Sequence, residues 1–250
     1  MFSTFRAIRR AVLAAAILFP ALSGLAQQTD VSRYDVYAGF AGFETPALSL
    51  AQYGFHTQVG VNLKTWLSAG FDYSVASGQN SLTANLLKPS LQQQLGQEIE
   101  YLISIGVIPP TYKLVVPTDA FSQTFALGPQ LVYRHYKPIT LFIRPSLGAI
   151  RQKVTPHPTD PVATAIVAQL VPAGYKVDWT GFYGFGGGLD WNATKHFGIR
   201  VQNDLVYWRL FNDLLANGTW TDRYSIGLTY RFGRNIVPPP PTTHARANPL

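Results

Sequence analysis

Apolar and polar residues alternate with a period of two in eight stretches of the chain, and the clearest of these runs from Gly54 to Lys64. One side of this stretch carries Phe55, Thr57, Val59, Val61 and Leu63, and the other carries His56, Gln58, Gly60, Asn62 and Lys64. Successive side chains of a β-strand point to opposite faces of the sheet. The stretch is therefore predicted to be a strand with one face suited to lipid and the other to a wet or polar interior.

The eight predicted strands cover residues 33–44, 53–64, 66–76, 121–134, 139–150, 180–191, 197–207 and 223–232. Each is close to the ~9–11 residues that a tilted strand needs to cross a membrane. Aromatic residues gather near the strand ends, as in the two girdles that anchor a barrel at its lipid interfaces. One group is Trp66, Tyr133, Trp191 and Phe197, and the other is Tyr53, Phe121, Trp179, Tyr183 and Tyr224.

Short and long connections alternate between the strands. The short ones lie around Thr65, at 135–138 and at 192–196, and the longer ones lie at 45–52, 77–120, 151–179 and 208–222. Outer-membrane barrels have short periplasmic turns and longer extracellular loops, a sorting that a soluble antiparallel sandwich has no reason to show. We therefore predict an all-β protein, an eight-stranded antiparallel up-and-down transmembrane β-barrel with both termini in the periplasm.

The inward faces of the predicted strands carry aspartate, arginine, glutamine, serine and glycine. Asp72, Asp190 and Asp204 can face Arg134, Arg144, Arg200 and Arg231 across the barrel. The interior of an eight-stranded barrel is only wide enough for side chains to fill it. We therefore predict that these residues form a plug of ion pairs and hydrogen bonds, and we favour the plug over a gated path for protons or ions.

Composition supports a membrane environment. Charged residues make up 13% of the chain, against about 25% in an average soluble domain. Because no apolar run of about 18 residues follows the N-terminus, membrane-spanning helices are excluded. The chain has no cysteine, which excludes disulfides and thiol chemistry. Three of its 20 basic residues lie in the first ten positions, and no basic stripe with interleaved aromatics indicates nucleic-acid binding.

The two ends of the chain indicate export. Residues 1–26 read as a cleaved signal peptide, with basic residues from Arg6 to Arg10, an apolar stretch at 11–22 and small residues before the cleavage point. A retained anchor is disfavoured, because the apolar stretch is about 12 residues and a membrane span needs about 20. The barrel is then expected at 27–233, followed at 234–250 by a proline-rich periplasmic tail.

The last predicted strand contains the sharpest short motif, Ser225 to Phe232. It resembles the C-terminal signal by which outer-membrane barrels are handed to the barrel assembly machinery. Ser225 and Gly227 supply its polar residue and glycine, and Tyr230 and Phe232 supply its closing hydrophobic positions. The strand differs from that pattern in one respect, because it is followed by the tail.

With these elements, the chain from about Tyr34 to Gly233 resembles the bacterial outer-membrane β-barrel domain family, including the barrels of outer-membrane protein A-type proteins. The resemblance is carried by residues 34–40, 127–129, 186–190 and 227–233. It implies an eight-stranded protein of the bacterial outer membrane that contacts lipid. Members of the family mostly have no assigned activity.

Catalytic, cofactor and metal sites are not indicated. The glycine run 184–188 lacks the following helix that a nucleotide site requires, so we interpret its glycines as lining a crowded interior. The five histidines have no metal-ligand spacing. The His-x-Ser pair of the lipid A deacylases does not occur, and His56 has Gln58 at that spacing and no obvious carboxylate to orient it.

Two of the long loops carry helical patterns. Apolar residues recur at helical spacing in residues 89–106, and Asp160 and Pro161 predict the start of a short helix that ends near Val171. The helices could pack on each other as a cap over the rim. They could instead bind a hydrophobic ligand, a partner protein or the outer leaflet, because exposed apolar faces often mark interaction sites. Loops 77–120 and 151–179 are thus the candidate binding regions.

These observations predict a structural or surface-interaction role without catalysis. A narrow pore and a lipid-modifying outer-membrane enzyme are the alternatives. A secreted lipocalin-like carrier is disfavoured, because the interior is expected to be polar whereas such carriers are apolar inside.

Overall fold

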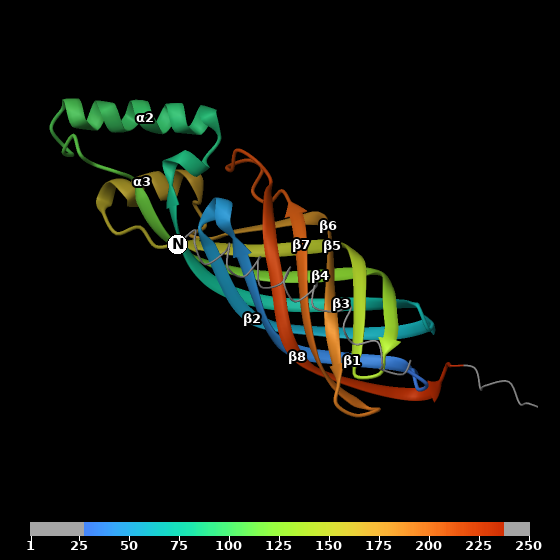
Figure 1. Ribbon diagram of the computed structural model, residues 1–250. Coiled ribbons are helices and arrows are strands. Elements are labelled where there is room, and N and C mark those ends of the chain that lie inside the picture. Colours follow the sequence, from blue (N-terminus) through green and yellow to red (C-terminus); the bar gives the residue numbers. More distant parts are fainter. Residues whose placement is uncertain (1–27, 238–250) are drawn as a thin grey trace, which may run out of the picture.

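The computed structural model describes residues 28–237, which form a closed antiparallel barrel of eight strands (Figure 1). Each strand pairs with the next, and β8 closes the ring on β1. The predicted fold class is confirmed. The predicted signal peptide at 1–26 and most of the predicted tail lie outside the described residues, so both remain predictions.

The strands are β1 (Ser32–Thr45), β2 (Leu50–Lys64), β3 (Leu67–Thr83), β4 (Val115–Tyr136), β5 (Ile139–Pro156), β6 (Lys176–Asn192), β7 (Phe197–Trp208) and β8 (Thr219–Asn235). The short turns all lie at the end of the barrel where β1 begins and β8 ends, and the longer connections lie at the opposite end (Figure 1). We call these the short-turn end and the long-loop end.

Several strands extend farther toward the long-loop end than the alternation predicted. β3 continues to Thr83 instead of Ala76, and β4 begins at Val115 instead of Phe121, with Thr83 opposite Val115 in the register. Polar residues such as Asn80 and Ser81 carry no alternating apolar signal, but their backbone groups still pair with a neighbouring strand. The predicted loop 77–120 therefore shortens to 84–114.

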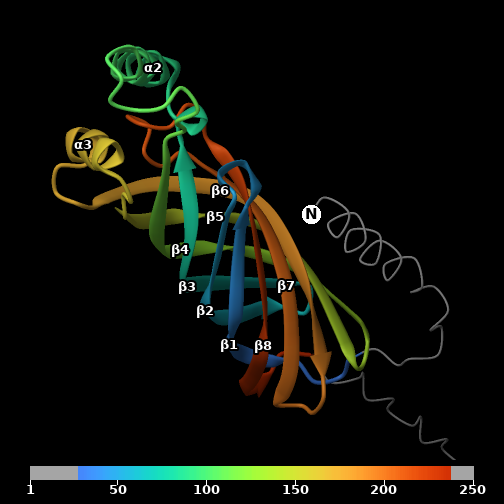
Figure 2. The same ribbon diagram turned by 90° about the vertical axis from the view of Figure 1, so that its left-hand side faces the viewer.

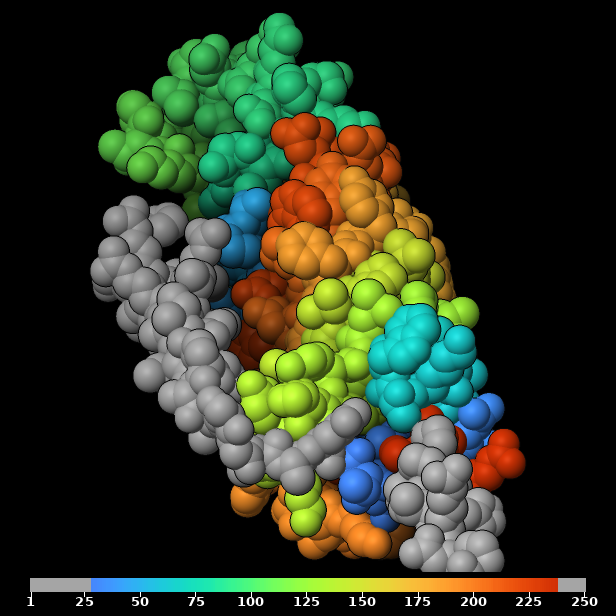
Figure 3. All heavy atoms as spheres, turned by 45° about the vertical axis from the view of Figure 1, so that its right-hand side comes forward, coloured from blue at the N-terminus to red at the C-terminus, as the bar shows by residue number. Residues whose placement is uncertain are grey.

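The two predicted loop helices are present as α2 (Pro89–Ser104) and α3 (Pro161–Leu170). Both stand at the long-loop end, with α2 the farther from the barrel (Figure 2). In the space-filling view, the connection that holds α2 projects past the rim (Figure 3). Within residues 28–237, neither helix has the length and apolar character needed to cross a membrane.

Burial alternates along every strand and defines the two faces of the barrel. The outward face carries large apolar side chains that remain exposed, among them Phe55, Val59, Leu127, Ile143 and Leu228. The inward face buries polar residues such as Gln58, Ser122 and Thr229 together with several charges. The core of this protein is therefore the enclosed barrel interior, and the exposed apolar surface surrounds it.

Candidate functional site

The middle of the barrel holds an arginine between two carboxylates. Arg144 of β5 forms two hydrogen bonds with Asp204 of β7, from Nε to Oδ1 at 3.1 Å and from Nη2 to Oδ2 at 2.6 Å. Its third nitrogen, Nη1, lies 2.6 Å from Asp72 Oδ2 on β3. All three side chains are almost fully buried. Such two-pronged arginine–carboxylate contacts are strong and directional, so they tie β3, β5 and β7 together across the interior.

A second arginine does the same nearer the short-turn end. Arg200 Nε lies 2.6 Å from Asp190 Oδ1, and Arg200 Nη2 lies 3.4 Å from Asp35 Oδ1. Arg200 also donates to Gln58. Arg231 Nη2 approaches the second oxygen of Asp190 at 3.0 Å. We call the buried charges of both groups the ion-pair layer; it comprises Asp35, Asp72, Arg144, Asp190, Arg200, Asp204 and Arg231.

Six of the seven residues predicted for the plug lie in this layer, and Arg134 lies apart from it. The guanidinium of Arg134 donates to Asn62 Oδ1 at 2.6 Å and to the backbone carbonyl of Thr65, near the short turn between β2 and β3. The sequence analysis did not predict Asp35, although its side chain points inward from β1. It also did not predict Arg223, which is eight residues before Arg231 on β8 and therefore points to the same side.

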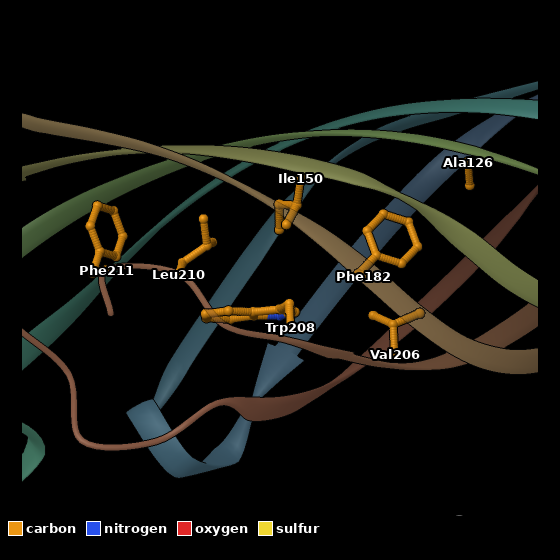
Figure 4. Packing of buried hydrophobic residues seen from close by; sticks show 7 residues of the cluster. All are labelled: Ala126, Ile150, Phe182, Val206, Trp208, Leu210 and Phe211. Atoms are coloured by element: carbon orange, nitrogen blue, oxygen red, sulfur yellow. The ribbon is translucent and has the colours of Figure 1, made fainter. Parts of the chain in front are cut away.

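The interior also contains an apolar cluster, which corrects the expectation of a wholly polar lumen. Toward the long-loop end, seven buried apolar residues pack together, as Figure 4 shows, beside buried polar residues such as Gln52 and Ser122. They are Ala126, Ile150, Phe182, Val206, Trp208, Leu210 and Phe211. We call this cluster the apolar layer. Leu210 and Phe211 come from the β7–β8 connection, where Phe211 adopts a left-handed backbone conformation (φ 52°) that brings its ring into the cluster.

Arg223 joins the two layers. Its Nη2 atom is 3.9 Å from Asp204 Oδ2, and its guanidinium lies 5.3 Å from the ring centre of Phe182 and 5.5 Å from that of Phe43. The faces of aromatic rings attract cations, most strongly where water is excluded. The same guanidinium thus lies between the Asp204 carboxylate of the ion-pair layer and two aromatic rings.

His56 has a carboxylate nearby, contrary to the sequence-based interpretation. Its Nδ1 lies 3.0 Å from Ser225 Oγ, and its Nε2 lies 3.8 Å from Asp72 Oδ1. The residue types are those of a hydrolytic triad, but 3.8 Å is too long for the histidine–aspartate hydrogen bond that such a triad uses. All three side chains are buried within the strands of the interior. We interpret them as part of the interior packing.

Two cavities lie on opposite sides of the layers. One, of about 450 Å³, opens at the short-turn end and is bounded by Asp190, Arg200 and Arg231. The other, of about 100 Å³, lies at the long-loop end between Phe211, Val154 and the α3 residue Ile166. None of Asp72, Arg144, Asp204, Trp208 and Phe182 lines either cavity.

The residues 28–31 lie across the short-turn end. Gln28 Nε2 donates to the backbone carbonyls of Tyr136 at 2.9 Å and Ile139 at 3.1 Å, and to Thr140 Oγ1 at 2.9 Å. The backbone amide of Val31 donates to Asn235 Oδ1 at 2.9 Å. These contacts connect the segment before β1 to β4, β5 and β8, and they narrow the opening of the larger cavity.

The glycine run of β6 lies on a strand, as the interpretation of a crowded interior requires. A Cβ atom added at Gly186 would lie 1.8 Å from Asp204 Oδ1, and one added at Gly188 would lie 2.6 Å from the ring of Phe142. Glycine is the only residue that leaves room for the Arg144–Asp204 pair and for Phe142 at these two positions.

Gly186→Ala is expected to lower the free energy of unfolding by about 1–3 kcal/mol, because the methyl group must displace Asp204 from Arg144. Urea unfolding in a defined detergent or lipid measures the change. The control is Gly96→Ala in α2, where nothing lies within 4 Å of the added atom. There the exchange favours the helix, and equal losses for both variants would contradict the packing argument.

The two loop helices each contribute buried apolar residues to one shared cluster, Leu95 from α2 and Ala163 and Ile166 from α3. It comprises Leu87, Leu95, Leu114, Val116, Ala163 and Ile166. The β7–β8 connection joins it, because Leu87 pairs with Leu215 and the backbone amide of Lys88 donates to the carbonyl of Leu214 at 2.8 Å. The long loops therefore share one packed cluster, and we call them together the cap. That the two helices close over the rim remains a prediction.

Asp160 connects the two halves of the cap. Its Oδ1 atom accepts a hydrogen bond from the Ala163 amide at 2.8 Å, the N-terminal cap of α3, and another from the Tyr112 hydroxyl at 3.0 Å. Burial, followed by this hydrogen bond and the carboxylate charge, raises the pKa of Tyr112 to about 12. The phenol therefore stays protonated, and the contact survives, until the pH approaches that value.

Asp160→Ala is expected to destabilise α3 by about 1 kcal/mol, because alanine cannot accept the hydrogen bond of the Ala163 amide. Faster hydrogen exchange of the α3 amides and earlier proteolysis of the loop would show it. Asp160→Asn retains the capping oxygen and serves as the control. If the α3 amides exchanged equally fast in the alanine and asparagine variants, the hydrogen bond from the Asp160 side chain would not stabilise α3.

The residues of the predicted assembly signal divide between the two faces of β8. Ser225 points inward to His56, while Tyr230 and Phe232 lie on the outward face with ring centres 5.9 Å apart. Gly227 lies opposite Gly39 of β1. Their use as an assembly signal remains a prediction. Among residues 28–237, no group of three histidine, aspartate or glutamate side chains is placed to hold a metal ion.

No protein-family model and no curated protein matches the sequence. Among solved structures, the chain is similar to Neisserial surface protein A, with 11% identity, 80% of this chain and 96% of that chain covered, and a TM-score of 0.46. Ail, the attachment invasion locus protein of Yersinia pestis, has 14% identity, coverages of 80% and 99%, and a TM-score of 0.43. Outer membrane protein OprG of Pseudomonas aeruginosa has 10% identity, coverages of 84% and 100%, and a TM-score of 0.45. These proteins are outer-membrane β-barrels, the class that the sequence resembles.

Proposed function

We propose that this protein is a non-catalytic barrel of the bacterial outer membrane that holds a packed loop cap at the cell surface for structural support or surface interactions. The observation that carries the proposal is the belt of large apolar side chains around the outward face. Leu127, Ile143 and Leu228 there are each 63–65% exposed. Contiguous apolar patches beyond a few hundred Å² are rare on soluble monomers, whereas a membrane barrel requires such a band.

The outward aromatics support the same location. Trp66, Trp191 and Phe197 are exposed near the short-turn end, and Trp179 and Tyr183 are exposed toward the long-loop end. Tyrosine and tryptophan rings favour the boundary between lipid and water. The short turns would then face the periplasm and the cap would face outside. An outer-membrane barrel reaches this location through the barrel assembly machinery, which we propose as a transient partner.

The filled interior favours this role over the alternative of a narrow pore. A permeating ion would have to pass the ion-pair layer, where Arg144 and Arg200 are held by carboxylates from several strands. It would then meet the apolar layer, where Phe182 offers no polar group to replace its water and the indole N–H of Trp208 already donates to Thr221. The two cavities end on either side of these layers.

The outer tip of the cap supplies a surface for interaction. Tyr101, Ile105 and Val107 at the end of α2 are each more than half exposed. They lie away from the cluster that holds α2 to the rest of the cap. Exposed apolar residues at a protruding tip are of the kind that contact other molecules.

The proposal is tested on the full-length protein produced with its leader in a Gram-negative host. We expect it to fractionate with outer membranes, to resist extraction by salt, and to migrate differently on a detergent gel before and after heating. Identical migration together with salt extraction would overturn the barrel placement. Conductance steps in a planar bilayer would instead favour the pore, and a mass change in lipid A on expression would favour the lipid-modifying enzyme.

A further inference from the structure

We propose that the outward face of β5 to β7 at the long-loop end binds the phosphate headgroup of an outer-leaflet lipid. This inference rests on the proposed membrane location. Its first observation is a pair of cations on one strand. Arg151 and Lys153 are two residues apart on β5 and therefore share a face. The same outward face carries Leu147, which is 52% exposed.

Aromatic residues place these cations at the level of the lipid headgroups. Trp179 lies directly opposite Arg151 in the register, and its ring is 55% exposed. Lys153 has Phe121 on one side and Val177 on the other. The Lys153 ammonium lies 4.6 Å from the ring centre of Tyr175. Because exposed tryptophan and tyrosine favour the interface, the two cations lie where a headgroup begins.

The charges of this pair are not neutralised by the protein. Arg151 Nη1 donates to the neutral amide oxygen of Gln123 at 2.9 Å. Neither Arg151 nor Lys153 forms an ion pair with any carboxylate of residues 28–237, whereas Arg144 and Arg200 in the interior each pair with two. Basic residues at the level of the headgroups are attracted to anionic lipid. A phosphate would supply both the missing charge and acceptor oxygens.

A third cation extends the patch across β6. Arg209 follows the last residue of β7, Trp208, which pairs with Phe182 of β6. Its Nε donates to the Tyr207 hydroxyl at 3.2 Å, and it forms no ion pair within the described residues. We call Arg151, Lys153 and Arg209 the cationic patch. Its width over three strands suits a headgroup with more than one phosphate, such as that of lipid A.

The outward surface where β1 pairs with β8 has the opposite charge. Glu44 of β1 and Asp222 of β8 are direct neighbours in the register, both on the outward side at the long-loop end. An anionic headgroup is repelled there and attracted to the cationic patch. The two outward surfaces therefore select where around the barrel an anionic lipid binds.

The test is a titration of the detergent-solubilised full-length protein with phosphorylated lipid A and with the same lipid after removal of its phosphates. We expect the phosphorylated form to bind at least about tenfold more tightly, and Arg151→Gln combined with Lys153→Gln to lose at least about tenfold in affinity. The charge-preserving Arg151→Lys variant should retain most of the binding. The matched control, Glu44→Gln with Asp222→Asn, should bind as the wild type does.

Equal binding of both lipids, or full affinity in the Arg151→Gln, Lys153→Gln variant, would overturn the inference. So would displacement of the lipid by millimolar inorganic phosphate, because the site would then be one for free phosphate. The heat-dependent gel migration of each variant reports folding separately. If the protein shows heat-dependent migration but binds both lipids equally, only this inference is wrong. If the protein is soluble without detergent, the proposed membrane location is wrong as well.

Discussion

Arg144→Met is expected to lower the free energy of unfolding of the barrel by about 3–5 kcal/mol. Methionine fills much of the arginine's volume but cannot donate hydrogen bonds. Asp72 and Asp204 would then remain buried without their principal partner, and Arg223 lies 3.9 Å from only one of them. Breaking one side of a buried ion pair costs more than removing the whole pair. Urea unfolding in a defined lipid, followed by tryptophan fluorescence, measures the loss.

Two controls separate this effect from a general loss of arginine. Arg151→Met changes the same residue type on the same strand, but on the outward face and without a carboxylate partner. It should change the unfolding free energy by well under 1 kcal/mol. Adding Asp72→Asn and Asp204→Asn to Arg144→Met should recover most of the lost stability. If the triple variant were as unstable as Arg144→Met, unpaired charge would not be the cause.

Trp208→Ala, as a single substitution, is expected to lower the free energy of unfolding by about 3–5 kcal/mol, because it disrupts the apolar layer. The indole packs in the cluster with Phe182, and its Nε1 atom donates to Thr221 Oγ1 at 2.7 Å. Removing it leaves a cavity and takes away the donor. The same unfolding measurement detects the loss. The variant should still show no conductance, because the ion-pair layer remains in place.

Trp220→Ala is the matched control for this prediction. Trp220 lies on β8, opposite Tyr207 in the register, but its ring is outward and 44% exposed. Its loss removes contact with lipid and leaves no internal cavity, so the effect should be clearly smaller. Equal losses for Trp208 and Trp220 would show that the interior cluster adds nothing beyond an aromatic residue in a strand.

The alternation of residue types was sufficient to predict the number of strands, their direction and the inward position of most of the buried polar residues. Lipid outside and a narrow interior impose opposite demands on neighbouring residues, so each strand carries the same repeated information. Because every second residue of a strand faces inward, the sequence alone placed Asp72, Asp190 and Asp204 inside the barrel. The same counting along β1 and β8 would also have placed Asp35 and Arg223 inside.

The apolar layer was missed for a different reason. Four of its residues occupy inward-facing positions of their strands: Ile150, Phe182, Val206 and Trp208. Because apolar residues are also expected on the outward face, their residue type did not reveal which face they occupy. Their position near the long-loop end was the available signal. There the residues above, in the cap, are apolar as well.

Individual partners could not be predicted. The alternation does not state how far one strand is shifted against the next, and a shift changes which side chains meet across the interior. We expected Arg134 to face an aspartate, but it donates a hydrogen bond to Asn62. We expected no carboxylate near His56, but it lies near Asp72. The extension of β3 to Thr83 escaped prediction because backbone pairing outside the lipid requires no alternation.

That extension determines how far the tip of the cap stands from the rest of the barrel. Seven residues beyond Ala76 add about 23 Å of strand at roughly 3.3 Å per residue. They are paired with β4, and β4 pairs with β5 as far as Pro156, opposite Thr118. A paired ribbon bends much less than a single tether of the same length. Tyr101 and its neighbours are thus held away from the barrel on a paired base, where even a large molecule can reach them without contacting the barrel wall.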